Sequence, residues 1–212
     1  MDSMLNKTFE KEICKVTIDP IYSIQTARLY IRQTFKNDLD NFISLYGDEK
    51  VMEKYTDGNI RNPERIKIMI DINIKRWEEK NPYSSMSIFD KETNEFMGNI
   101  FISSFERSDN TGLLGFLFHQ KFWNKGFAKE AAFALTNVFI PYITSVSNIE
   151  TINEIIAYAR PDNLASNKIL QFCGFELSEV VEKFGAERFK YSLTLERLKN
   201  IRCNREQNTL CI

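Results

Sequence analysis

Apolar and polar positions alternate along the chain in a way that predicts two helices near its beginning. Apolar residues return at helical spacing after Asn37 and again after Pro63. Asn37 and Asp38 are suitable caps for the first helix, and proline is favoured in the first turn of the second. A short strand at 27–31 precedes both. The first third of the chain is therefore predicted to be β-α-α.

Strands dominate the next part of the sequence. Residues 85–89 and 96–105 predict a hairpin around the polar turn at 91–94. The following run, Leu-Leu-Gly-Phe-Leu-Phe at 113–118, is apolar throughout. That pattern is typical of a central strand that is covered on both faces.

Helices and strands alternate only in the second half. An apolar stripe predicts a helix that carries Ala128, Ala131, Ala132, Leu135 and Phe139 on one face. The later elements are a strand at 154–159, a helix at 164–172, and strands at 175–181 and 188–195. The order β-α-α-β-β-β-α-β-α-β-β predicts one mixed α/β (α+β) sheet. It does not fit a dinucleotide-binding Rossmann fold, because the first half also lacks a G-x-G-x-x-G run.

Length and composition suit one compact domain. The chain has 212 residues, of which 43% are hydrophobic. We expect an N-terminal arm at 1–24, the domain at 25–198 and a polar tail at 199–212. No apolar run is long enough for a membrane span, and residues 1–24 lack a signal-peptide core, so we expect a cytoplasmic protein.

Charge and cysteine content exclude several classes of partner. The net charge is −1, which gives no strong attraction to nucleic acid or to a membrane. The four cysteines form no C-x-x-C pair, and His119 is the only histidine, so we expect no metal site. The sequence leaves open whether the protein is a monomer or a homodimer.

The segment 116–132 is the richest in chemical information. It runs from an apolar strand through a short loop and Gly126 into an amphipathic helix. Free backbone N–H groups at such a helix start bind phosphate. Gly126 permits close backbone approach, and Lys125 and Lys129 add positive charge. By spacing alone, the segment is equally compatible with an ordinary strand-loop-helix connection.

Three motifs, in order, carry a resemblance to a known family. The run W-N-K-G-F-A-x-E-A at 123–131 resembles the Q/R-x-x-G-x-G/A pyrophosphate loop of GNAT acetyltransferases, and is especially similar to the W-G-K-G-Y-A-x-E-A form of their RimJ/RimL-like branch. Trp123 replaces the usual Gln or Arg, as is common in that branch. The runs T-A-R-L-Y-I-R at 26–32 and N-x-x-S-x-x-x-L-x-x-x-G-F at 163–175 resemble its opening strand and last helix. Together they cover about 24–196.

The resemblance implies a GNAT-like mixed central sheet with splayed strands and helices on both faces. It implies acetyl-CoA as co-substrate, with no metal, bound between the splayed strands. The strand before the loop would hold the pantetheine arm, the loop would hold the pyrophosphate, and the cap of the last helix would touch the cofactor. The implied cofactor-binding residues are Phe116, Leu117, Phe118, Asn124, Lys125, Gly126, Phe127, Ala128, Lys129 and Asn163.

Catalytic groups are less clearly indicated. Many family members use a tyrosine as the acid in the last helix, but Leu170 stands at the matching position here. Ser166 is the branch's alternative hydroxyl, although it also suits a first-turn helix position. The candidates for the general base are Glu187 and Glu182, which flank the last hairpin, and His119, which follows the central strand. Each of these three is otherwise a solvated side chain.

The expected reaction is transfer of an acetyl group from acetyl-CoA to a primary amine by direct attack on the thioester. The resemblance favours a protein N-terminal α-amine. A small-molecule amine, such as a polyamine, an amino acid or an aminoglycoside, is an alternative acceptor, because fold similarity does not fix the substrate. A non-catalytic acyl-CoA-binding module is the third hypothesis.

Overall fold

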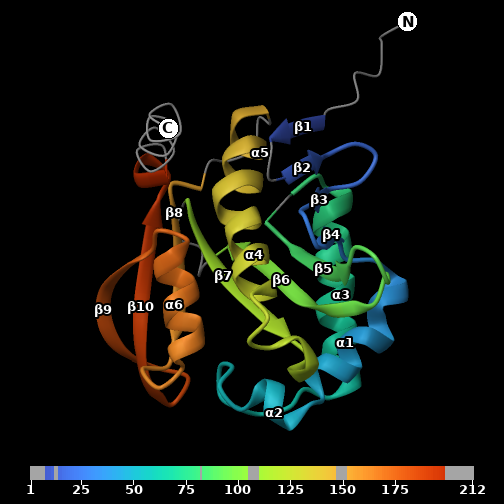
Figure 1. Cartoon of the computed structure of the whole chain (residues 1–212). Coiled ribbons are helices and arrows are strands. Elements are labelled where there is room, and N and C mark those ends of the chain that lie inside the picture. Colours follow the sequence, from blue (N-terminus) through green and yellow to red (C-terminus); the bar gives the residue numbers. More distant parts are fainter. Residues whose placement is uncertain (1–7, 12–13, 82, 105–109, 147–151, 199–212) are drawn as a thin grey trace, which may run out of the picture.

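The computed structural model describes residues 8–11, 14–81, 83–104, 110–146 and 152–198 (Figure 1). The predicted tail at 199–212 lies outside the described residues, as does the predicted strand end at Phe105. The strands are β1 (Thr8–Lys11), β2 (Cys14–Thr17), β3 (Ser23–Gln25), β4 (Leu29–Gln33), β5 (Ser85–Asp90), β6 (Phe96–Ser104), β7 (Thr111–Phe118), β8 (Glu154–Ala159), β9 (Glu176–Lys183) and β10 (Ala186–Thr194).

Six labelled helices accompany the sheet. They are α1 (Leu39–Tyr46), α2 (Glu49–Met52), α3 (Pro63–Glu78), α4 (Phe127–Phe133), α5 (Ile140–Val146) and α6 (Leu164–Phe172). A π-helical segment at Ala134–Phe139 joins α4 to α5. Asn62 caps α3, with Pro63 in its first turn, as the sequence predicts.

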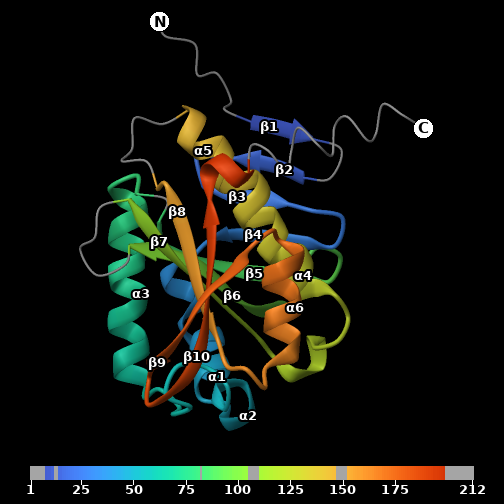
Figure 2. The same ribbon diagram turned by 90° about the vertical axis from the view of Figure 1, so that its left-hand side faces the viewer.

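All ten strands form one sheet in the order β1-β2-β3-β4-β5-β6-β7-β8-β10-β9. Every neighbouring pair is antiparallel except β7 and β8, which run parallel. These two strands pair only where Thr111–Leu113 meets Glu154–Ile156, and then they separate (Figure 2). The rest of β7 pairs with β6 alone. The predicted mixed sheet with splayed strands is thus confirmed, and the separation leaves one edge of β7 free.

Helices cover both faces of the sheet. In Figure 2, α4, α5 and α6 lie on one face, and α1 and α3 lie on the other. The predicted apolar stripe packs α4 and the π-helical segment onto the sheet, with Ala131, Ala132, Leu135 and Phe139 all buried. The core on the opposite face includes Phe42 of α1. Both faces of the central strands are therefore covered, as their apolar sequence predicts.

The sheet begins earlier than the sequence indicates. We predicted no elements in residues 1–24, yet β1, β2 and most of β3 lie there. Val16 and Ile24 are fully buried and belong to the main core. These strands have three or four residues each, which is too short to produce a recognisable alternation.

Candidate functional site

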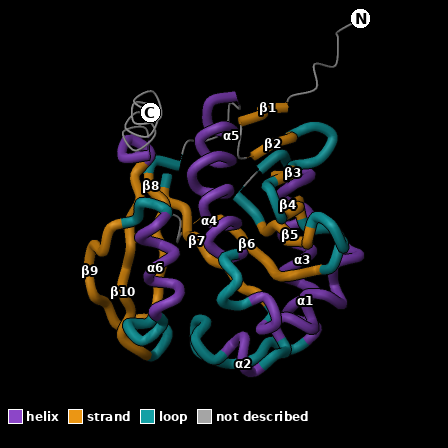
Figure 3. The backbone as a smooth tube through the Cα atoms, viewed as in Figure 1, coloured by secondary structure: helices purple, strands orange, loops and turns teal. Residues whose placement is uncertain are grey.

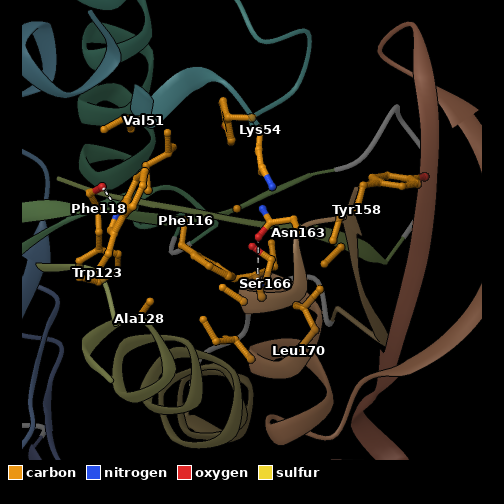
Figure 4. A pocket seen from close by; sticks show the side chains of 18 of the residues that line it. Val51, Lys54, Phe116, Phe118, Trp123, Ala128, Tyr158, Asn163, Ser166 and Leu170 are labelled. Atoms are coloured by element: carbon orange, nitrogen blue, oxygen red, sulfur yellow. Dashed lines mark hydrogen bonds between the residues drawn. The ribbon is translucent and has the colours of Figure 1, made fainter. Parts of the chain in front are cut away.

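A cavity of about 600 Å³ opens where β7 and β8 separate. Its lining comes from β7, the start of α4, the end of β8, α6, the segment from α2 to Thr56, and β10. Figure 4 shows it with α4 on one side and the segment of Val51 and Lys54 on the other. The cavity therefore reaches from one helix start across the free edge of β7 to a loop on the far side.

The start of α4 is built to face an anion. Gly126 is its N-cap and has φ of +82°, a left-handed conformation that favours glycine, and no side chain caps the helix. The first α4 amide bonded to the cap carbonyl is that of Glu130, which meets Gly126 O at 3.1 Å. The amides of Phe127, Ala128 and Lys129 precede it, and these residues line the cavity. Such an arrangement binds phosphate oxygens.

Side chains from the residues just before β4 hold this loop in place. Arg28 Nε and Nη2 lie 2.7 and 2.6 Å from Glu130 Oε2. Thr26 Oγ1 donates to Glu130 Oε1 at 2.6 Å, and Arg28 Nη1 donates to the Lys125 carbonyl at 3.0 Å. Arg28 also lies over the ring of Phe127, 4.4 Å from its centroid. The opening motif at 26–32 and the loop motif at 123–131 therefore contact each other directly.

Trp123 ties the loop to the free strand. Its Nε1 donates to the Phe118 carbonyl at 2.7 Å, at the end of β7. Its side chain lines the cavity. The residue that departs from the general Q/R-x-x-G-x-G/A pattern therefore fixes the loop against the strand through a hydrogen bond.

The start of α6 supplies the predicted hydroxyl. Asn163 is the N-cap, and its Oδ1 accepts from the Ser166 amide at 3.2 Å (Figure 4). Within the described residues, the Ser166 hydroxyl itself has no hydrogen-bond partner, and Ser166 lines the cavity. The capping role thus belongs to Asn163, and the Ser166 hydroxyl is free for other bonds. Leu170 is buried and also lines the cavity, where it offers no proton.

Nearly all of the predicted cofactor residues meet at this cavity. Its lining includes Phe116, Leu117, Phe118, Asn124, Gly126, Phe127, Ala128, Lys129 and Asn163. Lys125 is the exception, because it does not line the cavity; its carbonyl accepts a hydrogen bond from Arg28. The Lys129 ammonium lies over the ring of Phe172, 4.4 Å from its centroid.

The predicted bases lie elsewhere. Glu187 and Glu182 are exposed and face each other across the β9–β10 ladder. Neighbouring side chains of a strand point to opposite faces, so the burial of Arg188 in the cavity wall turns Glu187 away from it. His119 packs edge-on against Phe96, and burial, with Lys121 nearby, lowers its pKa. None of the three lines the cavity. Their position gives no support to a base role for them, which stays a prediction.

The far side of the cavity brings in residues that we did not predict. Tyr55 is among them, and burial raises the pKa of its phenol to about 12, so it stays protonated near neutrality. Arg188 of β10 donates to the Thr56 carbonyl, 132 residues away in sequence. A contact over that separation leaves no local pattern to detect. The further unpredicted lining residues here are Lys54, Thr56, Tyr158 and Phe184.

The described residues contain neither a metal-binding cluster nor a membrane-spanning helix. No group of three or more His, Cys, Asp or Glu side chains is placed to hold a metal ion. Among the same residues, no helix has both the length and the apolar character needed to cross a bilayer.

Comparison with known proteins identifies the fold. No curated protein sequence matches the chain, but several solved structures do. One is a GNAT-family acetyltransferase from Bacillus anthracis, with 19% identity and a TM-score of 0.65 over 82% of this chain and 99% of that one. Another is the ribosomal-protein-S5-alanine acetyltransferase of Vibrio fischeri, with 18% identity, a TM-score of 0.65, and coverage of 81% and 96%. A third is the spermidine N-acetyltransferase of Vibrio cholerae, with 16% identity, a TM-score of 0.62, and coverage of 82% and 99%.

The family model for the acetyltransferase (GNAT) domain matches residues 28–176, well over half of the chain. That span includes β4, the splayed β7 and β8, the loop before α4, and α6. The free edge of β7 and the open amides of α4 fit a CoA arm and its phosphates. The chain therefore belongs to the GNAT family of acetyl-CoA-dependent N-acetyltransferases.

Proposed function

We propose that this enzyme acetylates the N-terminal α-amine of a protein or peptide. The observation that carries the proposal is the composition of the cavity wall. Its described lining contains no histidine or aspartate, and its only glutamate, Glu53, pairs with Lys50 at 3.6 Å. An α-amine has a reference pKa of about 7.7–8.0, against about 10.4 for lysine. A wall without a free base therefore suits the amine that deprotonates most readily.

The cofactor would lie along the α4 side of the cavity. The amides of Phe127, Ala128 and Lys129 would meet the diphosphate, and the free edge of β7 would pair with the pantetheine amides. Bound there, acetyl-CoA supplies an activated acyl group. The backbone at Phe116–Phe118 would polarise the thioester carbonyl, in the manner of an oxyanion hole.

The chain's own residues then need to move one proton. As the amine nitrogen bonds to the acetyl carbon, the C–S bond breaks, the nitrogen has a proton to lose and the sulfur has one to gain. The Ser166 hydroxyl can accept and donate at the same time. We assign it the relay of that proton to the departing thiolate, since Leu170 cannot act as an acid. Tyr55 is a further hydroxyl in the wall. Burial raises its pKa and keeps it protonated, so it would take this role if Ser166 does not.

The comparisons suggest one other acceptor, a polyamine. The structural neighbours include a spermidine N-acetyltransferase as well as a ribosomal-protein one. A polyamine, however, needs anionic groups near its second charge, and the wall holds one paired glutamate.

Cytoplasmic localisation, and a monomeric or homodimeric state without nucleic acid or membrane as partners, stay predictions.

Thiol release from acetyl-CoA, followed by mass spectrometry of the products, tests the proposal. The acceptors are peptides with a free α-amine and blocked lysines, the matching peptides with a blocked α-amine and free lysines, spermidine, and free amino acids. We expect acetylation of the free α-amine peptides. Turnover of spermidine alone would refute the proposal, and CoA binding without turnover of any acceptor would favour the non-catalytic module. Glu187→Gln in the same assay tests the predicted base.

A further inference from the structure

Arg188 is a buried cation in the wall of the catalytic cavity. The residue is only 4% exposed, and it lines the cavity from β10. Nη2 donates to the Thr56 carbonyl, and Nη1 lies 3.3 Å from the Glu187 carbonyl. A guanidinium has more N–H donors than these two bonds use. Donors therefore remain for a ligand in the cavity.

No carboxylate of the described residues forms a salt bridge with Arg188. The one carboxylate of the neighbourhood, Asp162, is shared by Lys54 at 3.4 Å and Arg160 at 3.0 Å. Burial, and then the charge of Arg160, lower the pKa of Arg188. Arginine nevertheless stays charged at any pH where the protein works. Three cations thus surround one carboxylate, and the most buried of them lacks an anionic partner.

Buried charges in proteins are almost always paired, because an isolated one costs free energy. Where the protein supplies no partner beside a cavity, a ligand is the natural source of the opposite charge.

The position of Arg188 points to the acceptor and away from the cofactor. The phosphate-binding amides belong to α4, whereas Arg188 contacts the loop after α2. That loop and the β9–β10 turn lie at one end of the sheet (Figure 3). Figure 4 shows Lys54 of the same loop reaching toward Asn163, across the cavity from α4. The cationic group therefore lies where an acceptor can enter without crossing the cofactor.

We propose that Arg188 binds a carboxylate of the acceptor, next to the amine that is acetylated. This inference rests on the proposed function and deepens it, since it defines the acceptor's chemistry. A planar guanidinium can donate two parallel hydrogen bonds to a carboxylate, which fixes the acceptor's orientation as well as its charge. The same cations repel a polyamine. The carboxylate can belong to an acidic side chain near a peptide's N-terminus, or it can be the α-carboxylate of a free amino acid.

Matched acceptor pairs test the proposal on the unaltered enzyme. One arm compares peptides that begin Ser-Glu or Ala-Asp with the same peptides carrying Gln or Asn. The other arm compares free amino acids with their carboxamides. We expect kcat/KM to favour the carboxylate member by about tenfold to a hundredfold in one arm, the range of a charge-assisted hydrogen bond. The arm that shows the preference identifies the source of the carboxylate.

Substitutions assign the preference to Arg188. Arg188→Met should reduce the ratio between carboxylate and carboxamide acceptors to near one, and Arg188→Lys should restore part of it. Arg65→Met, which removes an exposed charge on α3, should leave the ratio unchanged. CoA affinity and a thermal melt of each variant show whether it is folded. If Arg188→Met does not fold, the acceptor ratios of the wild-type enzyme still show whether a carboxylate on the acceptor is preferred.

The outcomes separate this inference from the proposed function. Acetylation of peptide α-amines with equal efficiency for both members of each pair would overturn the role of Arg188 and keep the proposed function. Turnover of free amino acids but not of peptides, with the carboxylate preference intact, would keep the role of Arg188 and refute the proposed function. A loss of CoA affinity in Arg188→Met with an unchanged acceptor ratio would assign the residue to the cofactor and overturn the inference.

Discussion

The side chain of Arg28 holds the carboxylate of Glu130 through two nitrogens, at 2.7 and 2.6 Å, across 102 residues of sequence. Glu130 lies in the first turn of α4, close to the amides that we assign to the diphosphate. A carboxylate in that position repels phosphate unless its charge is neutralised. Arg28 supplies the neutralising charge and also fixes the Lys125 carbonyl.

This pair leads to a prediction about cofactor affinity. Arg28→Met should weaken CoA binding by about tenfold, because it frees the charge of Glu130 beside the phosphate and releases the loop. The double variant Arg28→Met/Glu130→Gln should recover most of that loss, since the repelling charge is then gone. Calorimetric titration of CoA into the wild type, both single variants and the double variant gives the full cycle. Additive losses in the double variant would show that the pair acts on CoA binding only through loop structure.

Gly126 allows a sharper test of the loop. Its φ is +82°, and a Cβ there would lie 3.4 Å from Arg28 Nη2. Gly126→Val should therefore abolish measurable CoA binding, because valine disfavours this backbone and adds bulk where the phosphate approaches.

Gly185 provides a control matched in strain. It has φ of +73°, and a Cβ there would meet nothing within 4 Å. Gly185→Val carries a similar backbone cost of about 1–2 kcal/mol but should keep CoA affinity. Equal CoA affinities for the two variants, measured on folded protein, would contradict our assignment of the phosphate site.

Local patterns explain which parts of this molecule the sequence predicts. The run at 113–118 and the glycine before α4 are each defined by a few adjacent residues, and both occur where expected. The hydrogen bond from Thr26 to Glu130 joins two predicted motifs over 104 residues, and no local pattern reveals such a contact. The acceptor side lies furthest from prediction, because Arg188 and Thr56 are brought together only by the folded sheet. The residues that we propose for the cofactor could therefore be predicted from the sequence, whereas those that we propose for the acceptor required the structure.

Metal removal should leave activity unchanged. Direct attack of an amine on a thioester needs no Lewis acid, and the described residues contain no cluster of three or more His, Cys, Asp or Glu side chains placed to hold a metal ion. We expect the same initial rate of thiol release before and after extended dialysis against a chelator. A loss of activity that zinc or magnesium restores would show that the mechanism proposed here lacks a component.

Ser166 and Asn163, three residues apart at the start of α6, separate a proposed catalytic role from helix capping. Asn163 caps α6 because its Oδ1 accepts a hydrogen bond from the Ser166 amide, whereas the Ser166 hydroxyl has no partner among the described residues and lines the cavity. Asn163→Ala should therefore cost about 1 kcal/mol of stability, as lost caps do. Ser166→Ala should leave the thermal melt almost unchanged.

The effects on kcat should have the opposite order, with the larger loss in Ser166→Ala. A hydroxyl that carries a proton in the transition state typically contributes about 10²–10⁴-fold, so Ser166→Ala should lower kcat within that range while CoA affinity stays nearly constant. Ser166→Thr, which keeps the hydroxyl, should retain more activity than Ser166→Ala. A normal kcat in Ser166→Ala would remove the serine from the mechanism and make Tyr55, which is protonated and in the same wall, the next candidate for the proton carrier. Tyr55→Phe, measured alone and together with Ser166→Ala, then tests Tyr55 directly, because loss of the true carrier lowers kcat even when the Ser166 hydroxyl is intact.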